Sequence, residues 1–228
     1  SRALLARVTD DIDLSNEACP FMAFREGHIC GAPARLFRIS FSGELAYEVN
    51  VPADYGYEVW DALMQAGKDL DIAPYGTEAM GIMRIEKGHV VGGELNGRTT
   101  ASDLGFEKML SSKKRFIGDT LKDRSALIGD QRQQLVGLKP VDGVSKLPRG
   151  AQLVADPNAP RPVIMQGEVT SQCESPNVGS PIGLGILTNG RARMGERLIA
   201  ASPLTDTFVE VEVCAPVFID PEGERLRG

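Results

Sequence analysis

The sequence has 228 residues, of which 42% are hydrophobic and 25% are charged, and its formal net charge is −6 at pH 7. This composition is ordinary for a globular protein, and the length allows one large domain or two small ones. The acidic balance argues against nucleic acid and against a polybasic membrane-surface role, and no apolar run reaches the roughly 20 residues of a membrane-spanning helix.

The first quarter of the sequence predicts mainly strands. A short helix is expected over residues 1–9, and residues 20–51 are rich in β-branched and aromatic positions. Gly31-Ala32-Pro33 interrupts this region. The stretch 38–50 alternates as a β-hairpin does, with Ser42-Gly43-Glu44 as its turn. Short successive strands separated by turns indicate antiparallel pairing.

Two helices are expected next. Asp54 suits the N-cap of an amphipathic helix that ends at Gly67. A second helix is expected over residues 76–87, where Arg84 and Glu86 are interpreted as members of structural ion pairs. Strands followed by helices in runs indicate an α+β domain.

The remainder of the chain changes character near its middle. Residues 92–104 are polar and Gly-rich and predict a loop, and the basic run 112–115 precedes a short helical stretch that ends near residue 127. From about residue 131, short strands separated by Gly or Pro turns predict a small β-barrel or sandwich. The sequence therefore predicts two domains, residues 1–128 and residues 129–228.

Familiar catalytic and cofactor motifs are missing from the sequence. There is no G-x-G-x-x-G fingerprint after a strand, no phosphate-binding G-x-x-x-x-G-K-[ST] loop and no G-x-S-x-G elbow. His28 and His89 lie in different predicted elements, so no metal site is expected. The cysteines form no C-x-x-C pair, which favours reduced thiols in a cytoplasmic protein. They are Cys19, Cys30, Cys173 and Cys214.

Several ordered motifs resemble one family. RISFSGELAYEVNVPADYG, then PYGTEAMGIMRIEKGHVVGG, then SKKRFIG are similar to the folate-binding aminomethyltransferase family, which includes the T-protein of the glycine cleavage system. The resemblance is closer to one branch, the C-terminal region of the α subunit of heterotetrameric sarcosine oxidase. EVTSQCESPNVGSPIGLGIL and APVFIDPEGERLRG extend it to the end of the chain.

This resemblance implies a fold and an activity. The fold is an incomplete folate-binding aminomethyltransferase domain followed by a C-terminal β-barrel, with tetrahydrofolate bound in the first domain. In the sarcosine oxidase branch a flavin elsewhere in the complex oxidises sarcosine, and tetrahydrofolate captures the one-carbon unit. The products are glycine, 5,10-methylenetetrahydrofolate and hydrogen peroxide. FAD, FMN, NAD and the other subunits are expected only in the rest of the enzyme.

The resemblance also assigns two candidate ligand-binding residues. Arg38, Phe41, Tyr47 and Glu48 carry the family's strand pattern, in which the glutamate grips the pterin ring. A carboxylate can accept two adjacent N–H groups of a pterin, and inside a cavity that pair would contribute on the order of a few kcal/mol. Phe41 is expected to lie against the cofactor. The alternatives are an outward strand carboxylate at Glu48 and ordinary core packing at Phe41; Tyr47 is expected in the core.

The sequence departs from the family pattern at two places. Met80 stands where the T-protein has an arginine, one helical turn before R-I-E. The family's catalytic aspartate belongs to the first half of the folate domain, which is expected upstream of Ser1. No catalytic residue is therefore assigned to this chain, and the isolated chain is expected to be inactive.

Three alternative functions stay open. A T-protein-like aminomethyltransferase is disfavoured by Met80, and a dimethylglycine-oxidising relative is the other rival among enzymes. A non-catalytic folate-binding module is a rival of another class. Relatives that act in iron–sulfur cluster assembly carry a cysteine in a K-G-C-Y-type motif, whereas the corresponding KKRFIGD contains none.

Overall fold

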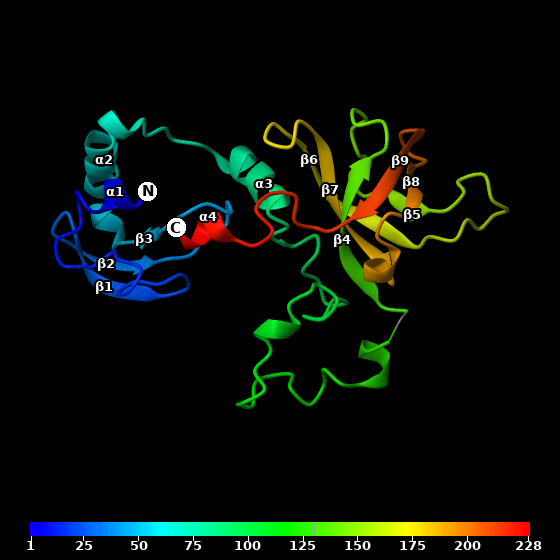
Figure 1. The fold of residues 1–228 in the computed structure, drawn as a ribbon, viewed down its shortest axis with the longest axis horizontal. Helices are drawn as coiled ribbons and strands as arrows, with labels where there is room; N and C mark the ends of the chain where they lie inside the picture. Colours follow the sequence, from blue (N-terminus) through cyan, green and yellow to red (C-terminus); the bar gives the residue numbers. More distant parts are fainter. Residues whose placement is uncertain (130) are drawn as a thin grey trace. The chain divides into compact units, whose positions relative to one another are not determined.

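The computed structural model describes residues 1–129 and 131–228 (Figure 1). The chain divides into two compact units, one formed by Ser1–Arg84 with Asp220–Gly228 and the other by Ile85–Ile219. Within these described residues, no helix combines the length and the apolarity needed to cross a membrane.

A three-stranded antiparallel sheet forms the centre of the first unit. Its strands are β1 (Phe24–Ile29), β2 (Ala32–Phe37) and β3 (Glu48–Asn50), paired in that order. The β1–β2 hairpin turns at Cys30-Gly31, and both residues adopt positive φ. An isolated bridge from Thr9 to Ile29 adds the N-terminal segment to the β1 side.

The predicted hairpin over 38–50 is wrong. Only Glu48–Asn50 is a strand, and it pairs with β2. The preceding residues form bends because local and buried side-chain bonds replace a strand ladder: the Gly43 N–H donates to Ser40 Oγ at 2.9 Å, and the buried Arg38 guanidinium bonds to other parts of the unit.

Two short helices, α1 (Arg2–Leu5) and α2 (Gly56–Ala66), pack on one face of this sheet and contribute to its core, with 3₁₀ turns η1 (Ala53–Tyr55) and η2 (Lys68–Leu70) beside α2. A further helix, α3 (Thr77–Glu86), follows along the chain, and the boundary between the two units falls within it. The two predicted main helices are confirmed within a residue or two. Asp54 lies inside η1 rather than at the N-cap of α2.

The core of the first unit lies between α1, α2 and the inner face of the sheet. Tyr47 packs against this core, as expected, and its hydroxyl accepts a bond from Arg2 Nε at 3.1 Å. At Gly27 a Cβ would come within 2.5 Å of side-chain atoms of Asp11 and of Ile12, so a larger residue there would displace both side chains. The buried core residues are Leu5, Leu14, Ile29, Ala32, Ala34, Leu36 and Val59.

The C-terminal tail belongs to the first unit. It contains α4 (Glu224–Arg227), and its backbone carbonyls accept bonds from two side chains of the unit. Asn16 Nδ2 donates to the Gly228 oxygen at 3.0 Å, and the Arg38 guanidinium donates to the Arg227 oxygen. The buried Arg38 guanidinium thus ties the tail to the irregular segment after β2, and the exposed Asn16 adds a second bond.

The second unit contains a closed six-stranded antiparallel barrel, as the sequence predicts (Figure 1). Around the barrel the order is β4-β7-β6-β5-β8-β9. The 3₁₀ turn η5 (Gly190–Arg193) joins β7 to β8. The strands are β4 (Gln133–Pro140), β5 (Gln152–Val154), β6 (Gly167–Ser175), β7 (Ser180–Thr188), β8 (Arg197–Ser202) and β9 (Thr207–Cys214).

The barrel interior is filled by aliphatic side chains. Alternate residues of β9 point inward, and Val209, Val211 and Val213 are all buried. At Gly167 a Cβ would lie 2.2 Å from the Ile186 oxygen, so the close approach of β6 to β7 requires glycine. A register shift between Val169 and Ser171 bends β6 at the same region.

A long connection precedes the barrel within the second unit. Among its described residues the regular structure is limited to two 3₁₀ turns, η3 (Glu107–Met109) and η4 (Ser125–Leu127). The expected helix ending near residue 127 is therefore wrong in type and extent, and the expected loop over 92–104 is confirmed. The predicted domain boundary near residue 128 stays a prediction.

Candidate functional site

The outer face of the β1-β2-β3 sheet gathers the side chains that could bind a flat ligand. Residues on this face alternate with the core residues beneath, as strand geometry dictates. The register places Phe24, Phe37 and Glu48 in one row across the three strands. This row brings two aromatic rings and a carboxylate onto one exposed surface.

The two rings of this row form a stacked pair. The ring centroids of Phe24 and Phe37 lie 5.6 Å apart with an interplanar angle of 25°. Phe24 is 52% exposed, although large apolar side chains are usually found inside. An exposed aromatic pair offers a planar surface on which another ring can stack.

Glu48 stands beside this pair and is exposed. Its Oε1 accepts a bond from Asn50 Nδ2 at 3.1 Å. A pterin bound inside a cavity would need an enclosed carboxylate. In this chain the Glu48 side chain lies on an open face instead. The reason is the strand alternation: Val49 packs against the core, so its two neighbours must point to the opposite face, which the described residues of this unit leave open.

Phe41 lies apart from the row. It is 39% exposed and occupies the bend that follows β2, and the register places Phe37 rather than Phe41 beside Glu48. Sequence reasoning missed Phe24 and Phe37. The alternation of residues in β1 and β2 already indicates that both rings point to the outer face. That they lie beside Glu48 follows only from the cross-strand register, which the sequence does not give.

A second row on the same face borders an open cavity of about 540 Å³. Glu26, Arg35 and Asn50 are aligned by the register, and all three line this cavity. Arg35 Nε donates to Glu26 Oε1 at 2.9 Å, and both side chains are largely exposed. The cavity thus adds one solvated ion pair and one amide to the aromatic row.

The rim of this cavity includes His28, which is fixed by an aspartate. His28 Nδ1 lies 2.9 Å from Asp11 Oδ2, and the His28 backbone N–H donates to Asp11 Oδ1 at 2.6 Å. The bond to the His28 ring, followed by the backbone bond, lowers the pKa of Asp11. Asp11 therefore stays a carboxylate at neutral pH and orients the ring.

The described residues of the chain supply little of the chemistry that a nucleophile or a metal would need. Burial, together with the charge of Asp10, raises the pKa of Cys30, and burial raises the pKa of Cys214 to about 11, so neither thiol is activated. In this described part, no group of three or more His, Cys, Asp or Glu residues is placed to hold a metal ion. The face presents a carboxylate that can accept bonds from a ring with N–H donors.

The R-I-E motif at the end of α3 has a structural role. Glu86 is buried and accepts bonds from Ser175 Oγ at 2.5 Å and from Asn177 Nδ2 at 2.9 Å. It thereby fixes the β6–β7 hairpin within the second unit. Arg84 is also buried, and Met80 is partly buried on the same helix.

Comparison with protein families matches most of the chain. The family described as "GCVT N-terminal domain" matches residues 1–114, and the family described as "Glycine cleavage T-protein C-terminal barrel domain" matches residues 133–220. The second match coincides with the closed barrel. The predicted fold class, a T-protein-like α+β domain followed by a barrel, is confirmed.

The chain is similar over its whole length to proteins named sarcosine oxidase subunit alpha. It is 44% identical to that of Rhizobium meliloti, over 99% of this chain and 23% of the relative, and 41% identical to that of Corynebacterium sp. strain U-96, over 100% and 24%. The chain therefore spans about a quarter of these relatives. An aminomethyltransferase of Halothermothrix orenii is 30% identical over 87% of this chain and 53% of the relative.

A solved structure shows the same fold. The crystal structure of glycine cleavage system aminomethyltransferase T from Bartonella henselae superimposes with a TM-score of 0.75, at 21% identity, over 96% of this chain and 56% of that chain. The superposition covers nearly the whole chain, as the two family matches together do, and the matches give the order of the two domains. The chain belongs to the glycine cleavage T-protein family, with a region of the N-terminal GCVT domain followed by the C-terminal barrel domain.

Proposed function

We propose that this chain is the folate-binding portion of a sarcosine oxidase α subunit. The observation that carries the proposal is whole-chain identity of 40–44% to three proteins named as that subunit, against 30% to the aminomethyltransferase of Halothermothrix orenii. In the complete enzyme a flavin would accept the two electrons removed from sarcosine. This chain would hold tetrahydrofolate, which takes the one-carbon unit as glycine is released.

The outer sheet face supplies the contacts for this role. Glu48 accepts the two adjacent N–H groups of the pterin in a fork, and the charge on the carboxylate strengthens both bonds. Phe37 and Phe24 offer the pterin a planar apolar surface. Phe41 is retained as a further contact to the ligand, from the bend that precedes β3. The geometry of the row supports this assignment, because the carboxylate and the rings share one face.

The proposal extends to the parts that this chain would need. The catalytic acid–base residue, FAD, FMN, NAD and the other sarcosine oxidase subunits would belong to the rest of the enzyme, so the chain alone would give no sarcosine-dependent peroxide. Within the chain we place the domain boundary near residue 128. It is supported by family matches that end at residue 114 and resume at residue 133.

A titration with folinic acid tests the site. Glu48→Gln should weaken binding by about 10- to 100-fold, because a hydrogen bond to a charged group contributes about 1.5–3 kcal/mol. Glu44→Gln is the matched control: Glu44 is an exposed carboxylate four residues away, and it bonds to Arg225 at 3.0 Å. Calorimetry should place this control within about twofold of the wild type. Equal affinities for both variants, or no binding by the wild-type chain, would remove Glu48 from the proposal.

An oxidase of another secondary amine is the second candidate. The chain is 30% identical over its full length to 4-methylaminobutanoate oxidase (formaldehyde-forming) of Paenarthrobacter nicotinovorans, and it spans 27% of that relative. The two candidates share the folate site and differ in the amine that is oxidised elsewhere. Peroxide production by the complete enzyme from sarcosine, dimethylglycine or 4-methylaminobutanoate separates them.

A further inference from the structure

The aromatic row lies at one end of the sheet. Phe24 is the first residue of β1, Phe37 is the last of β2 and Glu48 is the first of β3. Beyond this row β2 continues into the irregular segment 38–47. The outer face of the sheet therefore extends from the aromatic row in one direction only, toward the second row and its cavity. A ligand that is held at the aromatic row and continues across the sheet must pass over the second row.

Asn50 joins the two rows. Its Nδ2 donates to Glu48 Oε1 at 3.1 Å, and the same residue lines the open cavity of about 540 Å³. Two residues along a strand span about 7 Å, so the Glu48 carboxylate and the cavity are neighbours on the outer face. All residues that line this cavity belong to the first unit.

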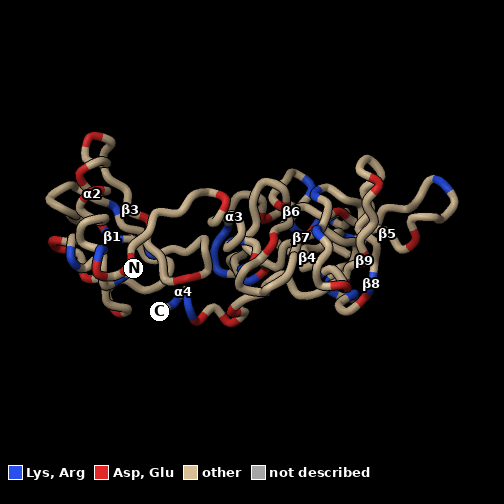
Figure 2. Tube along the Cα trace, turned by 90° about the horizontal axis from the view of Figure 1, so that it is seen from above, with Lys and Arg blue, Asp and Glu red and all other residues tan. Residues whose placement is uncertain are grey.

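The charges around the cavity decide what kind of group it can hold. Arg35 and Glu26 form an ion pair at 2.9 Å across β1 and β2, and Figure 2 shows both signs of charge on the trace around β1. The Asp11 carboxylate, 2.9 Å from His28 on the rim, adds a negative charge. A cavity without surplus positive charge favours an uncharged group over a carboxylate.

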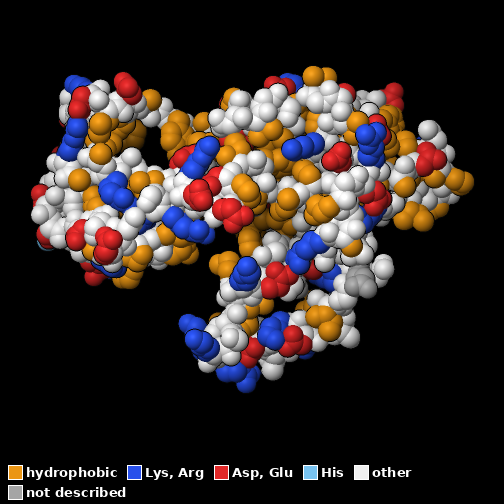
Figure 3. All heavy atoms as spheres, in the orientation of Figure 1, with side chains coloured by type: hydrophobic (Ala, Val, Ile, Leu, Met, Phe, Trp, Pro, Cys, Tyr) orange, Lys and Arg blue, Asp and Glu red, His pale blue; other side chains and the backbone are white. Residues whose placement is uncertain are grey.

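The walls of the cavity are suited to a ring. Pro33, Val51 and Pro52 line it with apolar surface, and Figure 3 shows hydrophobic side chains exposed among charged ones on the first unit. The planar guanidinium of Arg35 can stack on the face of an aromatic ring. A volume of about 540 Å³ also lies within the range of about 300–1,000 Å³ that small-molecule sites occupy.

We propose that this cavity is the subsite for the p-aminobenzoyl arm of tetrahydrofolate, so that the face distinguishes folates from pterins without an arm. The inference rests on the folate function proposed above. With the amino-pyrimidine edge on Glu48, the arm leaves from the opposite end of the pterin and turns along the strands into the cavity. Its ring lies between Pro33, Pro52 and the Arg35 guanidinium, and the glutamate tail extends past the rim into solvent.

Two ligands that differ in the arm test this subsite. Folinic acid carries the arm, whereas 5-formyl-6-methyltetrahydropterin has the same formylated ring with a methyl group in its place. Calorimetry with this chain should show that folinic acid binds about tenfold more tightly or better, because the arm buries apolar surface.

The outcomes separate the subsite from the proposed function. Equal affinities for the two ligands would overturn the arm subsite alone, provided that Glu48→Gln still weakens the binding of both. If the wild-type chain binds neither ligand, the folate function and the arm subsite are both overturned.

A substitution in the cavity wall sharpens the test. Arg35→Ala should weaken the binding of folinic acid by about 3- to 10-fold, because it removes the group that stacks on the ring. The affinity for the armless pterin should stay within about twofold, which also reports that the variant is folded. Equal losses for the two ligands, or an unchanged affinity for folinic acid, would overturn the proposal.

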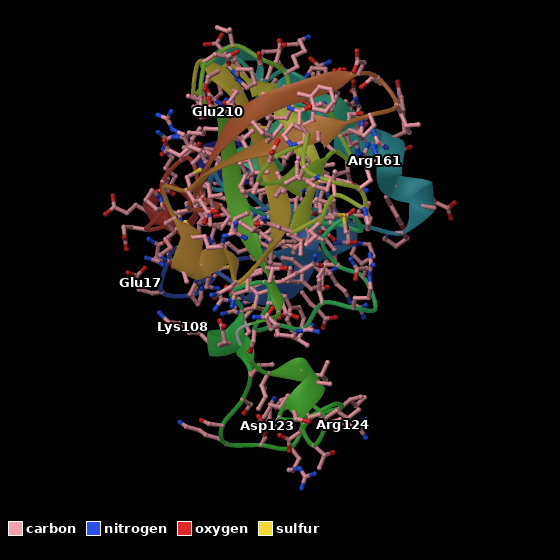
Figure 4. The ribbon with its side chains drawn as sticks, turned by 90° about the vertical axis from the view of Figure 1, so that its right-hand side faces the viewer. Glu17, Lys108, Asp123, Arg124, Arg161 and Glu210 are labelled. Atoms are coloured by element: carbon pink, nitrogen blue, oxygen red, sulfur yellow. The ribbon has the colours of Figure 1, made fainter. Side chains whose placement is uncertain are left out.

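Arg197→Ala is the matched control for this substitution. Arg197 on β8 is exposed, as Arg35 is, and it lies 3.8 Å from a glutamate of the neighbouring strand, Glu210, which Figure 4 labels on the barrel. The control should change neither affinity by more than about twofold. A loss of folinic acid binding equal to that of Arg35→Ala would overturn the assignment of Arg35 to the subsite.

Saturation-transfer NMR tests the position of the arm without a substitution. In a mixture of folinic acid with the wild-type chain, the aminobenzoyl ring protons should receive as much saturation as the pterin protons. The methylene protons of the glutamate tail should receive clearly less, because the tail lies in solvent. Weak transfer to the ring protons, or the strongest transfer to the tail, would overturn the proposal.

Discussion

Two irregular segments of this chain, residues 38–47 and residues 107–128, differ in how their side chains are placed. The first follows β2 and is fixed by a charged side chain that is 1% exposed, Arg38. The second exposes its apolar side chains, including Ile117 at 104%. An irregular segment becomes part of a folded unit where one of its own side chains is buried and donates to acceptors of other segments, and residues 107–128 lack such an anchor among the contacts that the structure describes.

The anchor of the first segment is specific in its contacts. Arg38 Nη1 donates to Asn16 Oδ1 at 2.7 Å and to the Cys19 oxygen at 2.8 Å, and Nη2 donates to the Arg227 oxygen. Its buried Nε has no partner among the described residues. All these acceptors are neutral amides and carbonyls, so the guanidinium acts as a multiple donor that ties three chain segments together.

Replacing this anchor should have the largest effect. Arg38→Met should lower the free energy of unfolding by about 2–4 kcal/mol, because it removes the three hydrogen bonds of a buried guanidinium and leaves the buried Cys19 oxygen without this donor. Urea denaturation measures the change. Arg35→Met is the control, since Arg35 is exposed and paired with the exposed Glu26, and it should cost less than about 1 kcal/mol. Similar losses for the two variants would contradict the role assigned to Arg38.

A second anchor lies near the start of the long connection that precedes the barrel. Glu94 is 0% exposed and accepts bonds from Thr170 Oγ1 and Ser171 Oγ, each at 2.6 Å, and from the Val91 N–H at 2.9 Å. The connection is therefore fixed to β6 at this end.

Neutralising this second anchor should cost less than removing Arg38. Glu94→Gln keeps the size of the side chain but replaces one acceptor oxygen by a donor, and the expected loss in the free energy of unfolding is about 1–3 kcal/mol. The partly exposed Glu168 provides the control, Glu168→Gln, with an expected change below about 0.5 kcal/mol. Urea denaturation measures both changes. The curves of the two variants should have different midpoints, while the dependence of the unfolding free energy on urea concentration should be the same in both. An unchanged midpoint for Glu94→Gln would show that its charge is dispensable.

The pH dependence of stability probes the next contact along the same connection. Asp103 is 3% exposed; burial acts to raise its pKa, but bonds from Arg132 and from Thr100 outweigh this, and the pKa of Asp103 is lowered. Because the folded-state pKa lies below the unfolded value of about 3.9, the stabilisation is fully present above that value. It is lost as pH falls through the folded-state pKa.

Asp103→Asn tests this linkage. Wild type and variant should differ in stability by about 1–2 kcal/mol at pH 7, and the difference should shrink below about pH 4. Denaturation at pH 7, 5, 4 and 3 measures it. A difference that is constant across this range would mean that the ionised carboxylate is not what Arg132 stabilises.

The sequence predicted those parts of the fold that local pattern determines. The amphipathic stripe after Asp54 predicted α2, and the short strands with Gly and Pro turns predicted the barrel. The hairpin over 38–50 failed, because alternation in the sequence does not reveal that Arg38 is buried and bonded to a tail about 190 positions away. Non-local polar contacts of this kind have no sequence period.

The candidate site was predictable only in part. Glu48 came from the family motif and lies on the predicted strand type, but its partners Phe24 and Phe37 required the β1–β2–β3 register. The helix expected up to residue 127 also failed: Gly118 adopts positive φ, which interrupts a helix, and the regular structure described after it is the 3₁₀ turn η4.

The smallest expected effect comes from the exposed ion pair between the tail and the first irregular segment. Arg225 Nη1 lies 3.0 Å from Glu44 Oε1, and both side chains are more than half exposed. Glu44→Gln should change the free energy of unfolding by less than about 0.5 kcal/mol, with little dependence on salt, because solvent already screens this pair. Urea denaturation at low and high salt measures it. A loss comparable with that of Arg38→Met would mean that the surface pair, and not the buried guanidinium, holds the tail against the sheet unit.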